Sequence, residues 1–119
     1  MRKSIVMIML LAVSCGERET GPPPDLLSRE KMVAVMVEMY VVEEKTTRLE
    51  LPSDSSKKVF DLLKARLYTK TGVADSTFKK SFDYYMNRPQ DMELIYTALV
   101  DTLNLKEQRA TVRQAPEKE

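Results

Sequence analysis

The chain has 119 residues, with 19 Lys and Arg against 18 Asp and Glu, so its formal net charge is only +1. Nucleic-acid binding usually needs a basic face or stripe, and this balance predicts no nucleic-acid partner. The sequence holds no His, no Trp and a single Cys. It therefore lacks the usual residues for zinc sites, internal disulfides and Ser-His-Asp catalysis, and we expect no metal, no cofactor and no enzymatic activity.

The first fifteen residues have the features of a signal that ends at the single cysteine. Arg2 and Lys3 give a positive start, and residues 5–13 are nine consecutive apolar residues. This run is too short to cross a hydrocarbon core of ~30 Å as a helix. Residues 11–14 lead into Cys15, and the pattern resembles the lipobox of bacterial lipoproteins. The alternative is an ordinary secretory signal that is cut near the same place.

The resemblance to lipoproteins implies a defined processing route. The signal peptide, residues 1–14, is removed, the Cys15 thiol receives a diacylglyceryl group, and the new amino terminus is acylated, for example by palmitate. Gly16 lacks the Asp that is linked in enterobacterial lipoproteins with retention in the inner membrane. We therefore expect a protein that its lipid holds in the bacterial envelope, with the outer membrane favoured. The sequence leaves open whether the protein faces the periplasm or the cell surface.

Composition divides the rest of the chain into three parts. Residues 15–25 form a tether, because the three consecutive prolines at 22–24 exclude a helix and favour an extended polyproline II segment. A helical domain is predicted for residues 26–105. Residues 106–119 are charged and nearly devoid of large apolar side chains, which predicts a frayed or disordered tail.

The domain begins with an unusually apolar segment. Ser28 is a suitable N-cap, and Glu38 is the one polar residue between residues 32 and 42. The valines in this run favour a strand locally, but its length and its Met and Ala content favour a helix over about residues 29–46. Its three methionines at helical spacing predict core packing or, alternatively, an adaptable binding groove; they are Met32, Met36 and Met39.

A polar connection precedes the second predicted helix. The Ser-Asp-Ser-Ser cluster at residues 53–56 is suited to cap a helix over about residues 56–70. Gly72 stands where a left-handed residue commonly ends a helix, and Val73 supplies the apolar contact that often follows.

Two further helices complete an all-α pattern. Asp75 or Ser76 is expected to cap the third helix, and Pro89 is placed as the first residue of the fourth. The fourth helix carries the clearest apolar stripe, formed by Met92, Ile95, Tyr96, Leu99, Val100 and Leu103. The sequence therefore predicts a small three- to four-helix bundle that follows a signal peptide and a Pro-rich tether.

Several landmark residues follow one another along residues 26–103 in this order: Leu26-Leu27, Lys31-Met32, residues 78–81, Tyr84-Tyr85, Pro89, Met92 and Ile95-Tyr96. This order resembles a family of small Bacteroidota lipoproteins, the domain-of-unknown-function family 4296. The resemblance implies a helical lipoprotein associated with the outer membrane, and it supplies no activity.

Glu38 is the candidate buried carboxylate. If it is desolvated, its pKa is raised and it could transfer a proton or hold a cation. The alternative places it at the helix edge, paired with a Lys or Arg. An enzyme that uses Glu38 with Asp83 or Asp91 has little support from the residue inventory, because no His or metal site accompanies these acids.

The adjacent tyrosines near the end of the third helix must differ in environment. Neighbouring helical residues point about 100° apart, so Tyr84 and Tyr85 cannot share a face. Tyr85 aligns with Phe78 and Phe82 and is predicted to be in the core. Tyr84 is then the more exposed ring and, with Pro89, is a candidate partner contact. The alternative is a ring that lies over its own helix corner.

These features favour a membrane-anchored envelope lipoprotein that acts as a non-enzymatic protein-interaction module. Its membrane contact is the lipid at Cys15, and its protein partner in the envelope is not identified by the sequence. The alternative is a binder of a lipid or other apolar ligand within the helical bundle, which the methionine-rich first helix would line.

Overall fold

The computed structural model describes residues 21–114, so the predicted signal peptide, Cys15 and residues 115–119 lie outside the described range. No strand occurs within this range. The predicted all-α fold is confirmed as a small helical bundle, and the Val-rich segment is helical. The helices are α1 (Arg29–Arg48), α2 (Ser53–Thr71), α3 (Asp75–Met86) and α4 (Pro89–Gln114).

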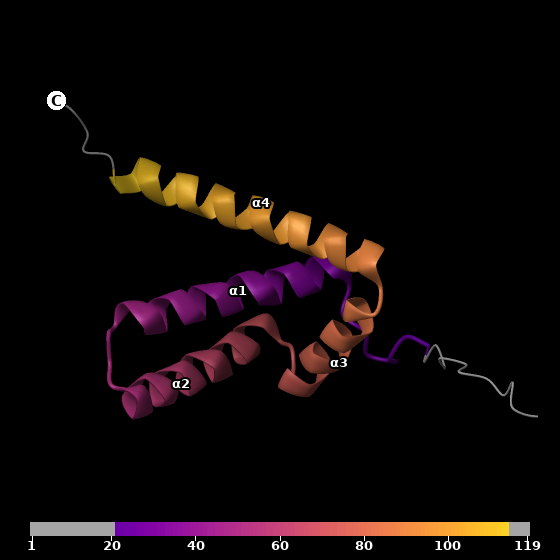
Figure 1. Cartoon of the computed structure of the whole chain (residues 1–119), viewed down its shortest axis with the longest axis horizontal. Coiled ribbons are helices and arrows are strands. Elements are labelled where there is room, and N and C mark those ends of the chain that lie inside the picture. The colour runs from indigo at the N-terminus through magenta and orange to yellow at the C-terminus, as the bar shows by residue number, and fades with distance from the viewer. Residues whose placement is uncertain (1–20, 115–119) are drawn as a thin grey trace, which may run out of the picture.

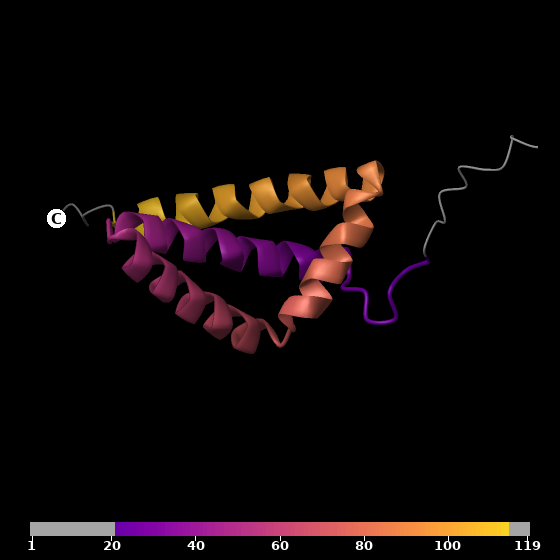
Figure 2. The ribbon, with the colours of Figure 1, turned by 60° about the horizontal axis from the view of Figure 1, so that its bottom comes forward.

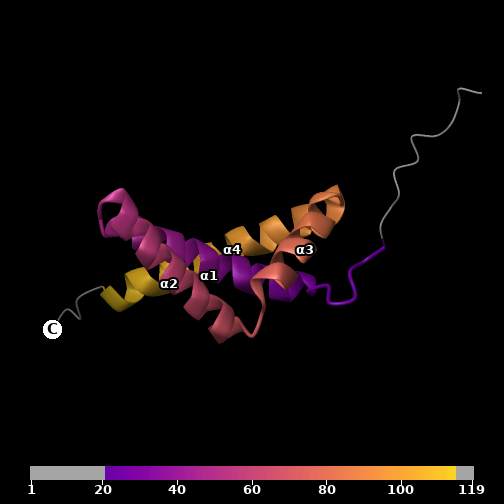
Figure 3. The ribbon, with the colours of Figure 1, turned by 90° about the horizontal axis from the view of Figure 1, so that it is seen from below.

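The first helix, α1, is the centre of the bundle and contacts each of the other three helices. It lies between α2 and α4, with α2 running antiparallel to it and α4 running in the same direction (Figure 1). The shorter α3 connects the end of α2 to the start of α4 and crosses the N-terminal end of α1 (Figures 2 and 3). This crossing makes the parallel arrangement of α1 and α4 possible.

Buried side chains form two clusters on different sides of α1. The cluster shared with α3 and α4 consists of Met32, Val33, Val37, Tyr85, Met92 and Ile95. The cluster shared with α2 and the following turn consists of Val35, Val42, Leu67 and Val73. Packing on several sides outweighs the modest helix propensity of valine, which explains why this segment is a helix rather than a strand.

The methionines of α1 belong to this packing. Met32 is fully buried in the first cluster, Met36 packs against the same cluster, and Met39 packs against the second. Flexible thioether side chains fill irregular gaps between helices that cross at different angles. The predicted core role of these residues is thus confirmed.

Three predicted helix boundaries are confirmed. The Lys31 N–H donates to the Ser28 hydroxyl at 3.1 Å, so Ser28 caps α1 as expected. Gly72 has φ 67° and ends α2 in the left-handed conformation, and Val73 after it is buried. Pro89 is the first residue of α4.

Two predicted caps are wrong. The Ser-Asp-Ser-Ser cluster forms the first turn of α2, whose N-cap is Pro52 and has no side-chain hydrogen bond. Likewise Ala74 is the N-cap of α3, and Asp75 is its first helical residue. In both cases the residue before the helix has a non-helical backbone and makes no side-chain cap. The acidic residue in the first turn, Asp54 in α2 and Asp75 in α3, interacts favourably with the positive end of the helix dipole.

The C-terminal boundary of the helical domain is also different from the prediction. The frayed tail expected from residue 106 is helical up to Gln114, while residues 115–119 lie outside the described range. Residues 106–114 include Lys, Glu, Gln, Arg and Ala, which favour helices, and no Gly or Pro interrupts them. All side chains from residue 104 to residue 114 are exposed, so helix propensity and the ion pair of Lys106 with Glu38, rather than burial, support this extension.

Candidate functional site

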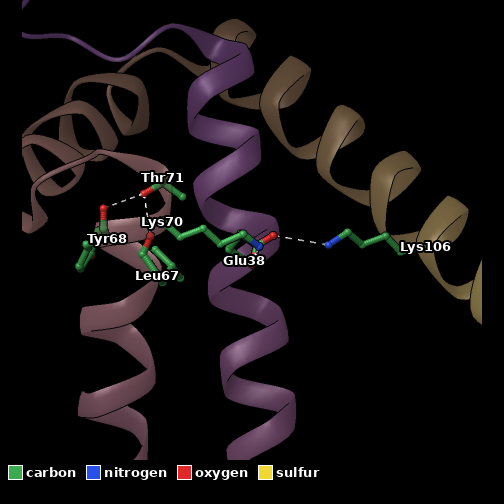
Figure 4. A network of polar contacts seen from close by, with 6 residues as sticks. All are labelled: Glu38, Leu67, Tyr68, Lys70, Thr71 and Lys106. Atoms are coloured by element: carbon green, nitrogen blue, oxygen red, sulfur yellow. Dashed lines mark hydrogen bonds and ion pairs between the residues drawn. The ribbon is translucent and has the colours of Figure 1, made fainter.

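Glu38 links the three long helices. From α1, its Oε2 lies 3.0 Å from the Lys70 Nζ of α2, and its Oε1 lies 3.7 Å from the Lys106 Nζ of α4 (Figure 4). The Glu38 side chain is 25% exposed, and the two lysines are more exposed. One part-buried carboxylate therefore connects the two helices that flank α1.

The electrostatics of Glu38 favour its charged form. Burial raises the pKa of this carboxyl, but the hydrogen bonds and charges of Lys70 and Lys106 outweigh burial and hold its pKa below the ordinary 4.5. The raised pKa considered from the sequence is therefore wrong, and the alternative of a paired carboxylate describes the residue. Asp91 is paired with a different residue, since its carboxylate lies 3.4 Å from the Arg29 guanidinium. Asp83 lies exposed on α3.

The two adjacent tyrosines near the corner between α3 and α4 have different environments, as predicted. Tyr85 is buried and donates its hydroxyl hydrogen to the Leu27 carbonyl at 2.7 Å. Tyr84 is half-buried, and the Arg88 guanidinium lies 4.3 Å from its ring centroid. The ring of Tyr84 thus lies over its own helix corner, as in the alternative interpretation. Pro89 is exposed beside it, and a partner contact at these two residues stays a prediction.

The chain that precedes α1 is attached to α3. The Leu27 N–H donates to the fully buried Ser81 hydroxyl at 3.0 Å, and the Thr77 hydroxyl donates to Asp25 at 2.9 Å. With the Tyr85 bond, these contacts fix the end of the predicted tether on one side of α3. The sequence did not predict this attachment. The available signal was the position of Ser81 four residues before the core residue Tyr85, because a polar side chain on the buried face of a helix needs a hydrogen-bond partner.

A second polar cluster surrounds Asp75 at the start of α3. Its carboxylate accepts from the Tyr68 hydroxyl at 2.8 Å and lies 2.8 Å from Lys79 Nζ and 3.6 Å from Lys64 Nζ. The hydrogen bonds from Lys79 and Tyr68 lower the pKa of Asp75 to about 2. Burial and the neighbouring Asp75 raise the pKa of Tyr68. The cluster joins α2 to α3, and only the i,i+4 spacing of Asp75 and Lys79 could have indicated it.

The outer side of α4 carries exposed apolar side chains. Leu94 is 55% exposed, Leu105 is 52% exposed and Val112 is 75% exposed. Beside Leu94 lies a groove of about 450 Å³ that is lined by Arg29, Glu30, Val33, Leu94, Ile95 and Ala98. Leu94, Leu105 and Val112 lie outside the inner stripe predicted from periodicity, so the sequence did not single them out.

The predicted inner stripe of α4 is only partly correct. Met92 and Ile95 are buried, and Leu99 and Leu103 pack against the core. Tyr96 is 44% exposed and Val100 is 53% exposed, because only α1 and α3 contact this helix closely and neither reaches that side. The apolar surface of α4 is therefore wider than the surface that the bundle covers.

Residues 23–109 match the family model described as a domain of unknown function (DUF4296). The match spans well over half of the chain. The chain belongs to this family. No curated protein and no solved structure matches it. The resemblance seen in the sequence is thus confirmed for the DUF4296 family, and a Bacteroidota source stays a prediction.

The described polar groups of this DUF4296 domain hold helices together. Between residues 21 and 114, no group of three or more His, Cys, Asp and Glu is arranged to hold a metal ion. Within the same range, no helix has the length and apolar character needed to cross a membrane. The Glu38 and Asp75 clusters each pair one carboxylate with two lysines from other positions in the bundle. This packing leaves large apolar side chains exposed on α4, among them Leu94 and Leu105, and at single positions elsewhere, such as Leu62.

Proposed function

We propose that this DUF4296 protein is a lipid-anchored protein of the bacterial envelope whose helical domain is a non-enzymatic protein-interaction module. The observation that carries this proposal is the outer side of α4, where Leu94 and Leu105 are more than half exposed. Exposed large apolar side chains that gather along one helix and border a groove are typical of partner surfaces. The groove beside Leu94 adds Val33 and Ala98 to this apolar surface.

The lipid anchor is supported by the sequence pattern that precedes Cys15. In this proposal the acyl chains hold the protein in the membrane, with the outer membrane favoured, and residues 15–25 act as the tether. The attachment of Asp25 and Leu27 to α3 places the domain end of the tether beside α3. The exposed side of α4 stays available to a partner.

The non-enzymatic character is supported by the state of the part-buried acids. Glu38 has a lowered pKa and is paired with Lys70 and Lys106, so it holds no proton to donate at neutral pH. Asp75 is also paired with lysines and has a pKa of about 2. Together with the lack of His in the chain, this leaves the described domain poorly equipped for acid–base catalysis.

The alternative, an apolar ligand within the bundle, has less support. Met32 is fully buried, and Met36 and Met39 pack against the two core clusters, so the residues expected to line a ligand site already contact neighbouring side chains. A ligand at this position would have to separate α1 from its neighbours. Purification with extractable lipid that is lost on Met36→Glu would favour this alternative.

Site-specific photo-crosslinking in living cells tests the partner surface. A photoreactive residue is placed at Leu94 or Leu105 on α4, and a matched control is placed at Leu62, which is 55% exposed on α2. We expect defined crosslinked proteins from the two α4 positions and none from Leu62. Equal crosslinking at all three positions, or none at any, would contradict the proposal. Tyr84→Ala tests whether the corner near Pro89 contributes to the same contact.

The anchor is tested separately by mass spectrometry of protein extracted from membranes. We expect the amino-terminal peptide to begin at Cys15 and to carry a diacylglyceryl group and an acyl chain. A free Cys15 thiol, or a protein found entirely in the soluble fraction, would contradict the anchor and leave the partner surface to be judged by crosslinking alone.

A further inference from the structure

Four exposed apolar residues of α4, Leu94, Ala98, Leu105 and Val112, follow a heptad spacing, while the exposed Tyr96 and Val100 lie on another side of the helix. Ala98, Leu105 and Val112 are separated by seven residues, and Leu94, Asp101 and Gln108 fall between or beside them at steps of three and four. All six side chains are exposed. On a helix, alternating steps of three and four place residues in one stripe, which is the pattern of a seam between two long helices. The buried residues Met92 and Ile95 are not part of this stripe, although Ile95 lines the same groove as Leu94 and Ala98.

Charge is divided unevenly along the same helix. Residues 89–105 contain three acidic residues and no Lys or Arg. Residues 106–114 contain three basic residues, Lys106, Arg109 and Arg113, and one acid, Glu107. A parallel pair of α4 helices would place like charges side by side, whereas an antiparallel pair would place each acidic half against a basic half.

We propose that the partner of this surface is a second copy of the chain, paired through antiparallel α4 helices. A two-fold axis near residue 103 brings the whole stripe into register: Leu94 faces Val112 of the second copy, and Asp101 faces Leu105 of the second copy. Arg109 of the second copy then lies one helical turn from that contact and can pair with Asp101. Such an interface is self-complementary, as a two-fold dimer requires.

This inference rests on the proposed interaction function, and it names the partner. One pair of helices buries a small surface, so we expect weak association in dilute solution. Anchoring of both copies in one membrane raises their effective concentration and favours the pair. The register places Leu94 in the two copies 18 residues, or about 27 Å, apart along the helix axis, which separates antiparallel from parallel pairing.

Thiol crosslinking of the full chain in membranes tests this register. Cys15 is the only natural cysteine, so the unmodified chain is the control for crosslinks through it. With a short bismaleimide, Leu105→Cys is expected to crosslink to itself, and Leu94→Cys is expected not to do so. Coexpressed Leu94→Cys and Val112→Cys chains are expected to crosslink to each other. A self-crosslink of Leu94→Cys equal to that of Leu105→Cys, or no dimer from Leu105→Cys, would overturn the proposal.

Charge exchange tests the pairing independently of the apolar residues. In the Leu105→Cys background, Asp101→Arg and Arg109→Asp are each expected to reduce the dimer by roughly fivefold, and the double variant is expected to restore it. Both residues are exposed, so circular dichroism should show unchanged helix content. Failure of the double variant to recover the dimer would contradict the assigned pairing.

The two proposals can fail separately. If photo-crosslinking at Leu105 captures a different protein and no second copy, the interaction function stands and the self-pairing is wrong. If neither position on α4 captures any protein, the interaction function itself fails.

Discussion

The helices α1 and α4 differ in how their apolar residues are used. α1 has 20 residues and buries Met32, Val33, Val35, Val37 and Val42, whereas α4 has 26 residues and buries only Met92 and Ile95. α1 is enclosed by three helices, while the side chains of α4 beyond Leu103 are all exposed. The apolar residues of α1 therefore serve the fold, and those on the outer side of α4 are available for association.

The largest expected effect comes from the covered side of α4. Ile95 is fully buried, so Ile95→Ala should lower the free energy of unfolding by about 2–5 kcal/mol. The adjacent Leu94 is 55% exposed, and Leu94→Ala should change the free energy of unfolding by less than about 0.5 kcal/mol. Urea unfolding followed by circular dichroism measures both. Similar losses for the two variants would contradict the division of this helix into two sides.

A smaller effect is expected where the chain before α1 meets α3. Tyr85→Phe removes the hydrogen bond from the buried hydroxyl to Leu27 and should cost about 1 kcal/mol of unfolding free energy. The control is Tyr96→Phe on the exposed side of α4, which should be neutral. The thermal unfolding midpoints of wild type, Tyr85→Phe and Tyr96→Phe measure the difference. An unchanged midpoint for Tyr85→Phe would show that this attachment does not stabilise the bundle.

The Glu38 contacts between the flanking helices should contribute less. Glu38→Gln should lower the free energy of unfolding by up to ~1 kcal/mol at neutral pH, because two exposed lysines supply the attraction. Glu44→Gln, which removes an exposed pair with Arg48, is the control and should have a smaller effect. Because the pKa of Glu38 is lowered, its contribution is present above pH 4.5 and is lost as the pH falls through the lower folded value.

At Asp75 we expect a pH-dependent difference in stability. The folded pKa of about 2 lies below the ordinary 3.8, so the contribution of Asp75 is complete above pH 3.8 and disappears as the pH falls through about 2. Asp75→Asn should therefore reduce stability at neutral pH and bring the two proteins closer together near pH 2. Urea unfolding across this range measures the difference. A constant difference between wild type and variant across the whole range would contradict the assigned ionisation.

The sequence allowed prediction of features that depend on neighbouring residues. The N-cap at Ser28, the left-handed Gly72 and the helix start at Pro89 depend on local backbone geometry. The helical state of the Val-rich segment followed from its length. The N-cap at Pro52 was missed because several polar residues in succession could each have capped α2.

Features that depend on the packing of distant segments could not be predicted in the same way. Helical periodicity marked Tyr96 and Val100 as inner residues of α4, but it could not show how narrow a strip of that helix α1 would cover. The sequence singled out Glu38, but its two lysine partners come from helices that only the fold brings to α1. The attachment of Leu27 to Ser81 likewise joins residues 54 positions apart.

The separation of folding from association in α4 is tested most directly by one double variant, Leu94→Ser with Leu105→Ser, in the full chain. Its thermal midpoint and its crosslinked species in cells are measured together with those of wild type. We expect an unfolding midpoint close to that of wild type and loss of the crosslinked species, because both leucines are more than half exposed. A midpoint lowered as far as that of Ile95→Ala, or crosslinked species that persist unchanged, would contradict the role assigned to this surface.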